Sequence, residues 1–217
     1  MSIPLSEVFY SIEGEGLRQG LATVFCRFSG CNIRCSFCDT VYAQEVDPNG
    51  DKFTSKELTI NLERWLMQHN CNRLTFTGGE PLLQEKFIVE FVKNHPVVEI
   101  NIETNGTIDF SRVMKYKNVM ITADIKLLSS GQYDMSNHQQ LNMLRAKDVV
   151  KAVVSNIDDL GMLSKFLTKY KGNAQVYIHP AWGVMDLKTL CEYAKDHPVR
   201  VGVQLHKYAW PPDMRGV

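Results

Sequence analysis

Residues 24–40 read VFCRFSGCNIRCSFCDT, a stretch in which an apolar strand pattern leads directly into three closely spaced cysteines. Side chains alternate between the two faces of a strand, so Val24, Cys26 and Phe28 share one face and Arg27 points the other way. The stretch therefore predicts a buried strand whose carboxyl end carries a loop of thiols.

The three cysteines Cys31, Cys35 and Cys38 form the pattern C-x3-C-x2-C. In a reducing cytosol, clustered thiols indicate metal binding more than disulfides. Structural zinc normally has four ligands in pairs, and no two histidines here have the H-x3-5-H spacing that would complete such a set. Three thiolates can instead hold three irons of a cuboidal iron–sulfur cluster and leave the fourth iron open. We therefore expect a catalytic iron–sulfur site.

The overall charge of the chain is balanced. Its 217 residues include 24 Lys and Arg against 24 Asp and Glu, which gives a formal net charge of zero. This balance argues against nucleic-acid or membrane binding driven by electrostatic attraction. No apolar run approaches the ~18 residues of a membrane-spanning helix, and the first residues do not resemble a signal peptide. We expect a cytoplasmic protein without nucleic-acid or membrane partners.

Strand-like and helix-like patterns alternate along the chain, which favours an α/β fold with a mostly parallel sheet. The predicted strands are 22–29, 73–77, 97–104, 118–125, 148–154, 175–179 and 199–205. The predicted helices are 55–69, 82–94, 157–170 and 186–196. The polar segment 127–146 is expected to be a mobile or partly helical insertion. No linker-like stretch interrupts the pattern, so residues 1–217 are predicted to form one domain.

Polar groups gather where the predicted strands end. Besides the cysteine loop, they are Thr77-Gly78-Gly79-Glu80-Pro81, Glu103-Thr104-Asn105-Gly106, Asp124-Ile125-Lys126 and Gln204-Leu205-His206-Lys207. A sheet with one face in water would also alternate polar and apolar residues, but it would not place five polar groups at strand ends. In α/β barrels, catalytic groups gather at the carboxyl ends of the strands. We predict a partial, incomplete TIM-like barrel of mostly parallel strands with outer helices.

Two motifs in this chain support each other. Phe37 precedes the last cysteine of the C-x3-C-x2-C pattern, and Gly78-Gly79-Glu80-Pro81 follows the next predicted strand. Together they resemble the radical S-adenosylmethionine (SAM) superfamily. Over nearly the whole chain, the sequence is similar to the 7-carboxy-7-deazaguanine synthase family. The matching segments are Glu7-Val8-Phe9-Tyr10-Ser11-Ile12-Glu13-Gly14-Glu15-Gly16, Val24-Phe25-Cys26-Arg27-Phe28-Ser29-Gly30-Cys31, Cys38-Asp39-Thr40, Phe76-Thr77-Gly78-Gly79-Glu80-Pro81-Leu82-Leu83, Ile102-Glu103-Thr104-Asn105-Gly106-Thr107 and Gln204-Leu205-His206-Lys207.

The resemblance implies a lyase of queuosine and deazapurine biosynthesis, a pathway that serves tRNA modification. Its substrate would be 6-carboxy-5,6,7,8-tetrahydropterin, and its reaction a radical ring contraction to 7-carboxy-7-deazaguanine that releases ammonia and returns SAM unconsumed. The implied cofactors are a 4Fe-4S cluster, SAM and Mg2+. The implied partners are an electron donor such as flavodoxin and a second copy of the chain in a homodimer.

The resemblance also implies a role for each matching residue. Cys31, Cys35 and Cys38 would hold the cluster, and the hydroxyl of Thr40 would bind magnesium, a hard cation that prefers oxygen ligands. The SAM contacts would be Ser36, Phe37, Asp39, Gly79, Asp124, Lys126 and His179. The substrate contacts would be Ile12, Glu13, Gly14, Glu15, Arg27, Thr77 and His206.

Some positions depart from the family pattern or allow another interpretation. Glu13 stands where Gln is common, and Asp124 stands where Ser is frequent. The tail ends in Val217 rather than in a proline whose carboxylate meets the substrate. As alternatives, Arg27 would only pair with a neighbouring Glu, Asp124 and Lys126 would form a surface pair, and His206 would be a core histidine.

Two other functions fit part of the sequence. The first is a radical SAM activating enzyme that abstracts hydrogen from a glycine of a large partner protein, because such enzymes share the cysteine pattern. The Glu13-Gly14-Glu15-Gly16 opening and Arg27 fit the pterin enzyme better. The second is a non-catalytic zinc-binding module, which the presence of iron–sulfur absorption would exclude.

Overall fold

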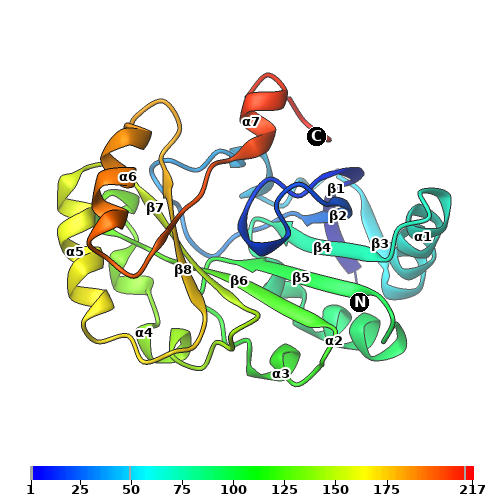
Figure 1. Ribbon diagram of the computed structural model, residues 1–217. Coiled ribbons are helices and arrows are strands. Elements are labelled where there is room, and N and C mark those ends of the chain that lie inside the picture. The colour runs from blue at the N-terminus through cyan, green and yellow to red at the C-terminus, as the bar shows by residue number, and fades with distance from the viewer. Residues whose placement is uncertain (1, 49, 213) are drawn as a thin grey trace.

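The computed structural model describes residues 2–48, 50–212 and 214–217, and its strands form one nine-stranded sheet (Figure 1). The strand order is β3-β1-β2-β4-β5-β6-β7-β8-β9. β1 runs antiparallel to β2 and β3, and every pairing from β2 to β9 is parallel. The two edge strands β3 and β9 do not pair with each other, so the barrel is open. The predicted partial barrel of mostly parallel strands is confirmed.

The elements follow the chain in regular alternation. The strands are β1 Ser2–Ile12, β2 Ala22–Phe28, β3 Lys52–Thr54, β4 Arg73–Gly78, β5 Glu99–Thr104, β6 Val119–Ile125, β7 Val149–Val154, β8 Gln175–Pro180 and β9 Arg200–Val201. The α-helices are α1 Ser55–Gln68, α2 Glu85–Asn94, α3 Ser111–Met114, α4 His138–Leu141, α5 Ile157–Leu167, α6 Leu187–Lys195 and α7 Leu205–Ala209. Short 3-10 helices are η1 Gly16–Arg18, η2 Val41–Ala43, η3 Pro81–Gln84, η4 Leu128–Ser130 and η5 Tyr133–Met135.

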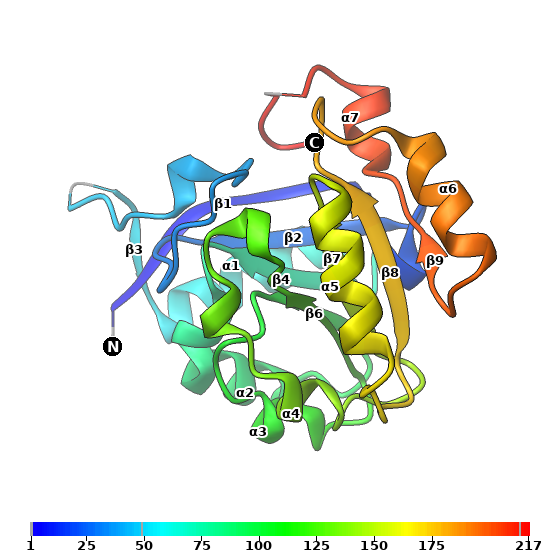
Figure 2. The ribbon, with the colours of Figure 1, turned by 90° about the vertical axis from the view of Figure 1, so that its left-hand side faces the viewer.

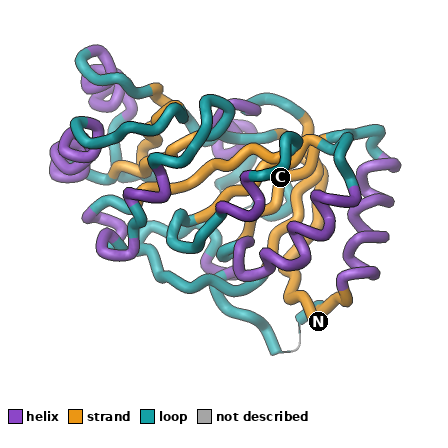
Figure 3. Tube along the Cα trace, turned by 90° about the horizontal axis from the view of Figure 1, so that it is seen from below, coloured by secondary structure: helices purple, strands orange, loops and turns teal. Residues whose placement is uncertain are grey.

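The outer face of the sheet is apolar and is covered by helices. Phe28, Phe76, Ile102 and Ile121 come from four neighbouring strands and are fully buried in one hydrophobic cluster. Figure 2 shows the strands curving through the molecule with helices outside them, and Figure 3 shows the same arrangement from below. Burial of large apolar side chains on this scale is the main stabilising contribution to such a fold.

The inner face of the sheet is polar, yet it is buried too. Thr75, Asn101 and Thr122 alternate with the core residues along their strands and are each less than 5% exposed. A sheet with one side in water would leave these side chains exposed. The polar face therefore lines a barrel interior, as the distribution of polar residues at strand ends predicts.

The short elements β3 and α3 were not predicted from the sequence, and two larger parts of the fold differ from the prediction. Residues 2–12 form the long strand β1, which was not predicted; it pairs antiparallel with β2 and so lies outside the repeated βα pattern. The predicted strand 199–205 is reduced to Arg200–Val201. Beyond it the chain turns away, because the Leu205 amide donates to the Gly14 carbonyl (3.0 Å) and α7 begins there. His206 and Lys207 therefore lie on a helix and not at a strand end.

Segment 127–146 contains η4, η5 and α4, in agreement with the predicted partly helical insertion. In the part of the chain that the structure describes, no helix combines the length and the hydropathy needed to cross a membrane.

Candidate active site

The cysteine loop follows β2 and is held by backbone hydrogen bonds to the segment around η2. The Gly30 amide donates to the Ala43 carbonyl (2.8 Å), and the Cys31 amide donates to the Gln44 carbonyl (2.9 Å). Gly30 has a φ of +98°, a conformation that favours glycine. The loop therefore turns sharply at the end of β2 and presents Cys31, Cys35 and Cys38 as free, partly exposed thiols.

The segment after β4 packs tightly against the cysteine loop. A Cβ atom added to Gly79 would lie 2.2 Å from the Gly30 carbonyl oxygen, so only glycine fits there. The Glu80 amide donates to the same carbonyl (2.9 Å). The Glu80 carboxylate is fully buried and accepts from Thr104 Oγ1 (2.8 Å) and from the Asn105 amide (2.7 Å). Glu80 thus ties together the ends of β4 and β5 under the thiols.

The donor set fits an iron–sulfur cluster. Thiolates are the usual ligands of such clusters, and Asn105 Nδ2 lies 3.7 Å from Cys31 Sγ, where it can donate to the sulfur. Burial raises the pKa of the Cys35 thiol, and the nearby Lys126 ammonium opposes that rise. Within residues 2–48, 50–212 and 214–217, no group of three His, Cys, Asp or Glu side chains is arranged to hold a single metal ion.

Asp124 and Lys126 lie at the end of β6, close to Cys35. Lys126 Nζ is 2.5 Å from Asp124 Oδ2, and the Lys126 side chain is 9% exposed. Burial disfavours the ammonium form, but the charge and hydrogen bond of Asp124, together with the nearby Cys35, raise the pKa of Lys126. The alternative of a surface ion pair is therefore wrong, because the lysine is inside the barrel.

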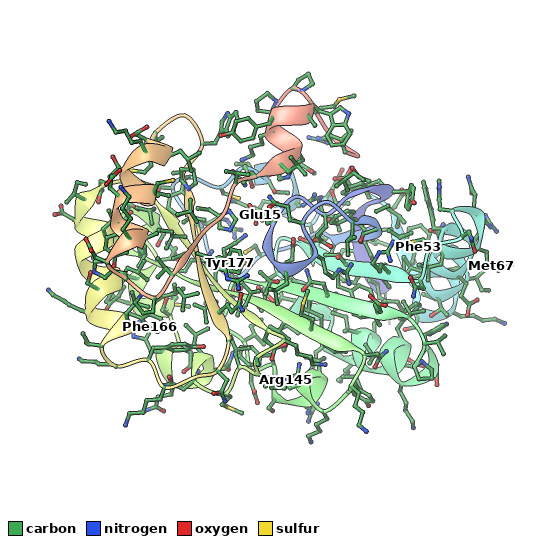
Figure 4. The ribbon with its side chains drawn as sticks, in the orientation of Figure 1. Glu15, Phe53, Met67, Arg145, Phe166 and Tyr177 are labelled. Carbon is green, nitrogen blue, oxygen red and sulfur yellow. The ribbon has the colours of Figure 1, made fainter. Side chains whose placement is uncertain are left out.

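A second buried lysine, Lys151 on β7, extends this charge network, and the sequence analysis did not select it. Its Nζ lies 2.8 Å from Glu15 Oε2 and 3.5 Å from Asp124 Oδ1. Burial opposes the ionisation of Glu15, but the charge and hydrogen bond of Lys151, with a smaller contribution from His179, lower the pKa of Glu15 to about 2. Figure 4 shows Glu15 in the middle of the molecule. The sequence of β7 does carry a sign of this lysine. Lys151 is the one charged residue in a strand of valines and alanine, which indicates that its side chain has a special environment.

Two more predicted site residues, His179 and Glu13, are buried in the interior: His179 lies beside Glu15, and Glu13 lies beside Arg18. His179 on β8 is 1% exposed, and its Nδ1 is 3.9 Å from Glu15 Oε1. Glu13 is also 1% exposed, and its Oε2 accepts from Arg18 Nη2 (3.1 Å) and Thr75 Oγ1 (2.7 Å). Arg18, which the sequence analysis also missed, reaches from η1 to the amino ends of the strands, where it donates to Thr23 Oγ1 (3.0 Å) at the start of β2 and to the Glu99 carbonyl (3.2 Å) at the start of β5.

Arg27 and Thr77 are neighbours in the register of β2 and β4. Arg27 Nε donates to Glu7 Oε1 (2.8 Å), and the guanidinium lies over the ring of Phe9 with its carbon 5.5 Å from the ring centroid. The pairing of Arg27 with a nearby Glu is therefore present. Thr77 Oγ1 donates to Glu103 Oε2 (2.8 Å), which joins β4 to β5 in the interior.

The helix α7 connects the end of the chain to its beginning. His206 packs against Gly14 so closely that a Cβ atom there would lie 2.1 Å from His206 Nδ1. Lys207 Nζ donates to Asp39 Oδ2 (2.6 Å), and Thr40 Oγ1 donates to Asp39 Oδ1 (3.0 Å). His206 therefore belongs to the contact between α7 and the Gly14 turn, and it is not a histidine of the hydrophobic core.

The remaining predicted site residues are Ile12, Ser36 and Phe37. Ile12 is half-buried at the end of β1. The Ser36 amide donates to the Ser130 carbonyl (3.1 Å), which links the cysteine loop to η4. Phe37 is half-buried in the loop between Cys35 and Cys38. The structure thus gathers most of the predicted residues around the end of the barrel where the parallel strands terminate.

Comparisons with known proteins agree with this arrangement. Residues 12–151 match the family model for a 4Fe-4S single cluster domain. The chain is 33% identical to the 7-carboxy-7-deazaguanine synthase of Clostridium acetobutylicum, with 100% of both chains covered. It is also 33% identical to the synthase of Methanospirillum hungatei, over 96% of this chain and 86% of the relative.

The fold has a close counterpart among solved structures. The crystal structure of QueE from Escherichia coli superposes with a TM-score of 0.72 and 21% sequence identity, and 95% of each chain is covered. This likeness concerns the fold, whereas the full-length sequence similarity identifies the family. The chain therefore belongs to the 7-carboxy-7-deazaguanine synthase family of radical SAM enzymes.

Proposed function

We propose that the protein converts 6-carboxy-5,6,7,8-tetrahydropterin to 7-carboxy-7-deazaguanine, with release of ammonia, in queuosine and deazapurine biosynthesis. The observation that carries the proposal is the thiol loop beside a buried interior in which Lys126, Asp124, Lys151 and Glu15 alternate in charge. A small anionic ring system with several N–H groups needs both cations and carboxylates for recognition. A partner polypeptide would not need such an enclosed set.

Cys31, Cys35 and Cys38 would hold the 4Fe-4S cluster, and Gly79, Asp124 and Lys126 would contact SAM. A cluster held by these thiols would supply the low-potential electron for reductive cleavage of SAM into methionine and a 5′-deoxyadenosyl radical. Lys126 would orient the SAM carboxylate, since a compact ammonium can approach an anion closely. The other proposed SAM contacts are Ser36, Phe37, Asp39 and His179.

Arg27 would bind the substrate carboxylate. Its Nε already donates to Glu7, and the described residues provide no hydrogen-bond partner for its two terminal nitrogens. A planar guanidinium can offer those nitrogens to a carboxylate. Glu15, as a carboxylate, would accept from the amino and ring N–H groups of the pterin. The other proposed substrate contacts are Ile12, Glu13, Gly14, Thr77 and His206.

Several further properties belong to the same proposal. Thr40 would bind Mg2+ through its hydroxyl, which the adjacent Asp39 carboxylate orients. The continuous sheet supports one domain over residues 1–217. We also propose a cytoplasmic homodimer that takes electrons from a donor such as flavodoxin.

The test is anaerobic incubation of reconstituted protein with SAM, reductant, magnesium and 6-carboxytetrahydropterin, followed by mass spectrometry of the products. We expect 7-carboxy-7-deazaguanine and ammonia, with no net consumption of SAM. Cys35→Ala should lose both the cluster and turnover, whereas Cys191→Ala, at an exposed free cysteine, should keep both. Deoxyadenosine formed only with a partner polypeptide would favour an activating enzyme, and colourless protein with stoichiometric zinc would favour a zinc module.

A further inference from the structure

Lys151 on β7 is ion-paired with Glu15 and Asp124 in the barrel interior, and the proposed function assigns no role to it. In the strand register it lies opposite Asp124 on β6 and opposite Tyr177 on β8. Its side chain is only 17% exposed, and all the other residues of β7 are apolar. A lysine in such a position needs charged partners, because burying an unpaired ammonium is costly.

Its partners belong to two different proposed subsites. Lys151 Nζ is 2.8 Å from Glu15, a proposed substrate contact, and 3.5 Å from Asp124, a proposed SAM contact. The second oxygen of Asp124 is 2.5 Å from Lys126 Nζ. The four side chains thus form a continuous series, Glu15–Lys151–Asp124–Lys126, with alternating charge.

The other charged or titratable groups near this series do not replace Lys151. His179 is close to Glu15, but burial lowers the pKa of its imidazole, which favours the neutral ring. Glu103 adds a further negative charge near Lys151. Lys151 is therefore the cation that neutralises Glu15 within the part of the chain that the structure describes.

We propose that Lys151 is a positioning residue that couples the SAM and substrate subsites, so that binding of one ligand tightens binding of the other. The proposal rests on the proposed function, which assigns Glu15 and Asp124 to those subsites. An anion that binds Lys126 competes with Asp124 for its ammonium. Asp124 then attracts Lys151 more strongly, and Glu15 becomes freer to accept from substrate N–H groups. The coupling is reciprocal, because it is a property of the two binding equilibria.

The test measures substrate affinity by calorimetry in reconstituted, unreduced protein, with and without SAM. In the wild type, we expect SAM to tighten substrate binding by at least about fivefold, the lower end of typical coupling between sites. Lys151→Met should reduce this ratio to about one, and Lys151→Arg should restore part of it. Lys165→Met, at an exposed position on α5, is the matched control and should keep the wild-type ratio.

Each alternative outcome has a distinct meaning. Substrate binding that SAM does not affect in the wild type, or an unchanged ratio in Lys151→Met, would overturn the coupling and leave the proposed function intact. A wild type that does not bind the pterin at all would overturn both. If Lys151→Met does not fold, Glu15→Gln breaks the same contact from its other side. An unchanged ratio in that variant would equally overturn the proposal.

Discussion

Glu13 and Glu15 are the same residue type, two positions apart, and both are buried, yet they lie in opposite electrostatic surroundings. Glu15 meets the ammonium of Lys151 and faces the strands β6 to β8. Glu13 lies toward β2 and β4, where its carboxyl group meets Arg18 and Thr75. Figure 4 shows Glu15 in the central part of the molecule.

The difference shows that the partner, and not burial alone, sets the charge of a carboxyl group in this barrel. Burial raises the pKa of Glu13 to about 8, Glu103 adds to the rise, and Arg18 only partly opposes it. Burial acts on Glu15 as well, but Lys151 lowers its pKa to about 2. At neutral pH, Glu13 is thus a neutral acid with one donor and Glu15 is a carboxylate that only accepts. A protonated Glu13 is similar to a glutamine in charge and shape.

The largest expected effect is a difference in the free energy of unfolding between the variants Glu15→Gln and Glu13→Gln. Glu15→Gln leaves Lys151 without its closest anion, and breaking a buried ion pair costs about 3–5 kcal/mol. Glu13→Gln replaces a group that is neutral in the folded state by a neutral amide, and it should lose no stability at neutral pH, because folding of the wild type there requires protonation of Glu13. Urea unfolding of the cluster-free proteins measures both values. Equal losses in the two variants would contradict the comparison.

The next effect concerns substrate binding on the Glu13 side of the barrel. Arg27→Ala should leave the cluster absorption unchanged but weaken pterin binding by roughly 1.5–3 kcal/mol, the contribution of a charged hydrogen bond. Calorimetry with reconstituted protein measures this change. Unchanged affinity would remove Arg27 from the substrate site, and Arg112→Ala, at an exposed position on α3, serves as the control.

The pH dependence of stability tests the charge state of Glu13. Its pKa of about 8 in the folded protein is above the ordinary value of 4.5, so between these values the folded state holds one proton more than the unfolded state. Stability from this group is therefore present at low pH and falls as pH rises through the window. Between about pH 6 and pH 7, wild-type stability relative to Glu13→Gln should fall by about 1.4 kcal/mol. A constant difference would show that Glu13 is ionised.

The smallest effect concerns the hydroxyl that supports Glu13. Thr75→Val removes a donor to Glu13 Oε2 (2.7 Å) and an acceptor for Arg18, which should cost about 1 kcal/mol of unfolding free energy. When Thr75→Val is made in the Glu13→Gln variant, its cost in unfolding free energy should differ from its cost in the wild type, because residues 13 and 75 interact directly. Strict additivity in a double-mutant cycle would argue against the interaction.

Much of the fold was predictable because local pattern and tertiary environment agree. The stripes of Val24, Cys26 and Phe28, and of Ile100 and Ile102, predict the outer core face correctly. The strand β1 was missed because its antiparallel pairing lies outside the repeated βα pattern. The strand predicted over 199–205 failed because tertiary contacts to Gly14 start a helix where the apolar alternation continues.

The thiol site was predictable from the spacing of the cysteines, and the position of Lys126 from its place at a strand end. The roles proposed for Gly79 and Lys126 come from the family resemblance. Lys151 and Arg18 were not predicted, because their importance comes from partners far away in the sequence. Glu15 and Asp124 reach Lys151 from two other elements, and no local pattern records such a meeting.

The joining of α7 to the Gly14 turn and to Asp39 has a consequence for the order in which the protein is made. Synthesis delivers the cysteine loop early and α7 last, so each new chain presents its thiols before Lys207 can reach Asp39. The contact between the Leu205 amide and Gly14 also joins residues from opposite ends of the chain, and such distant contacts form slowly. We therefore expect the docking of α7 against the Gly14 turn to be a late step of folding, which completes the surroundings of Asp39 after the thiol loop has formed.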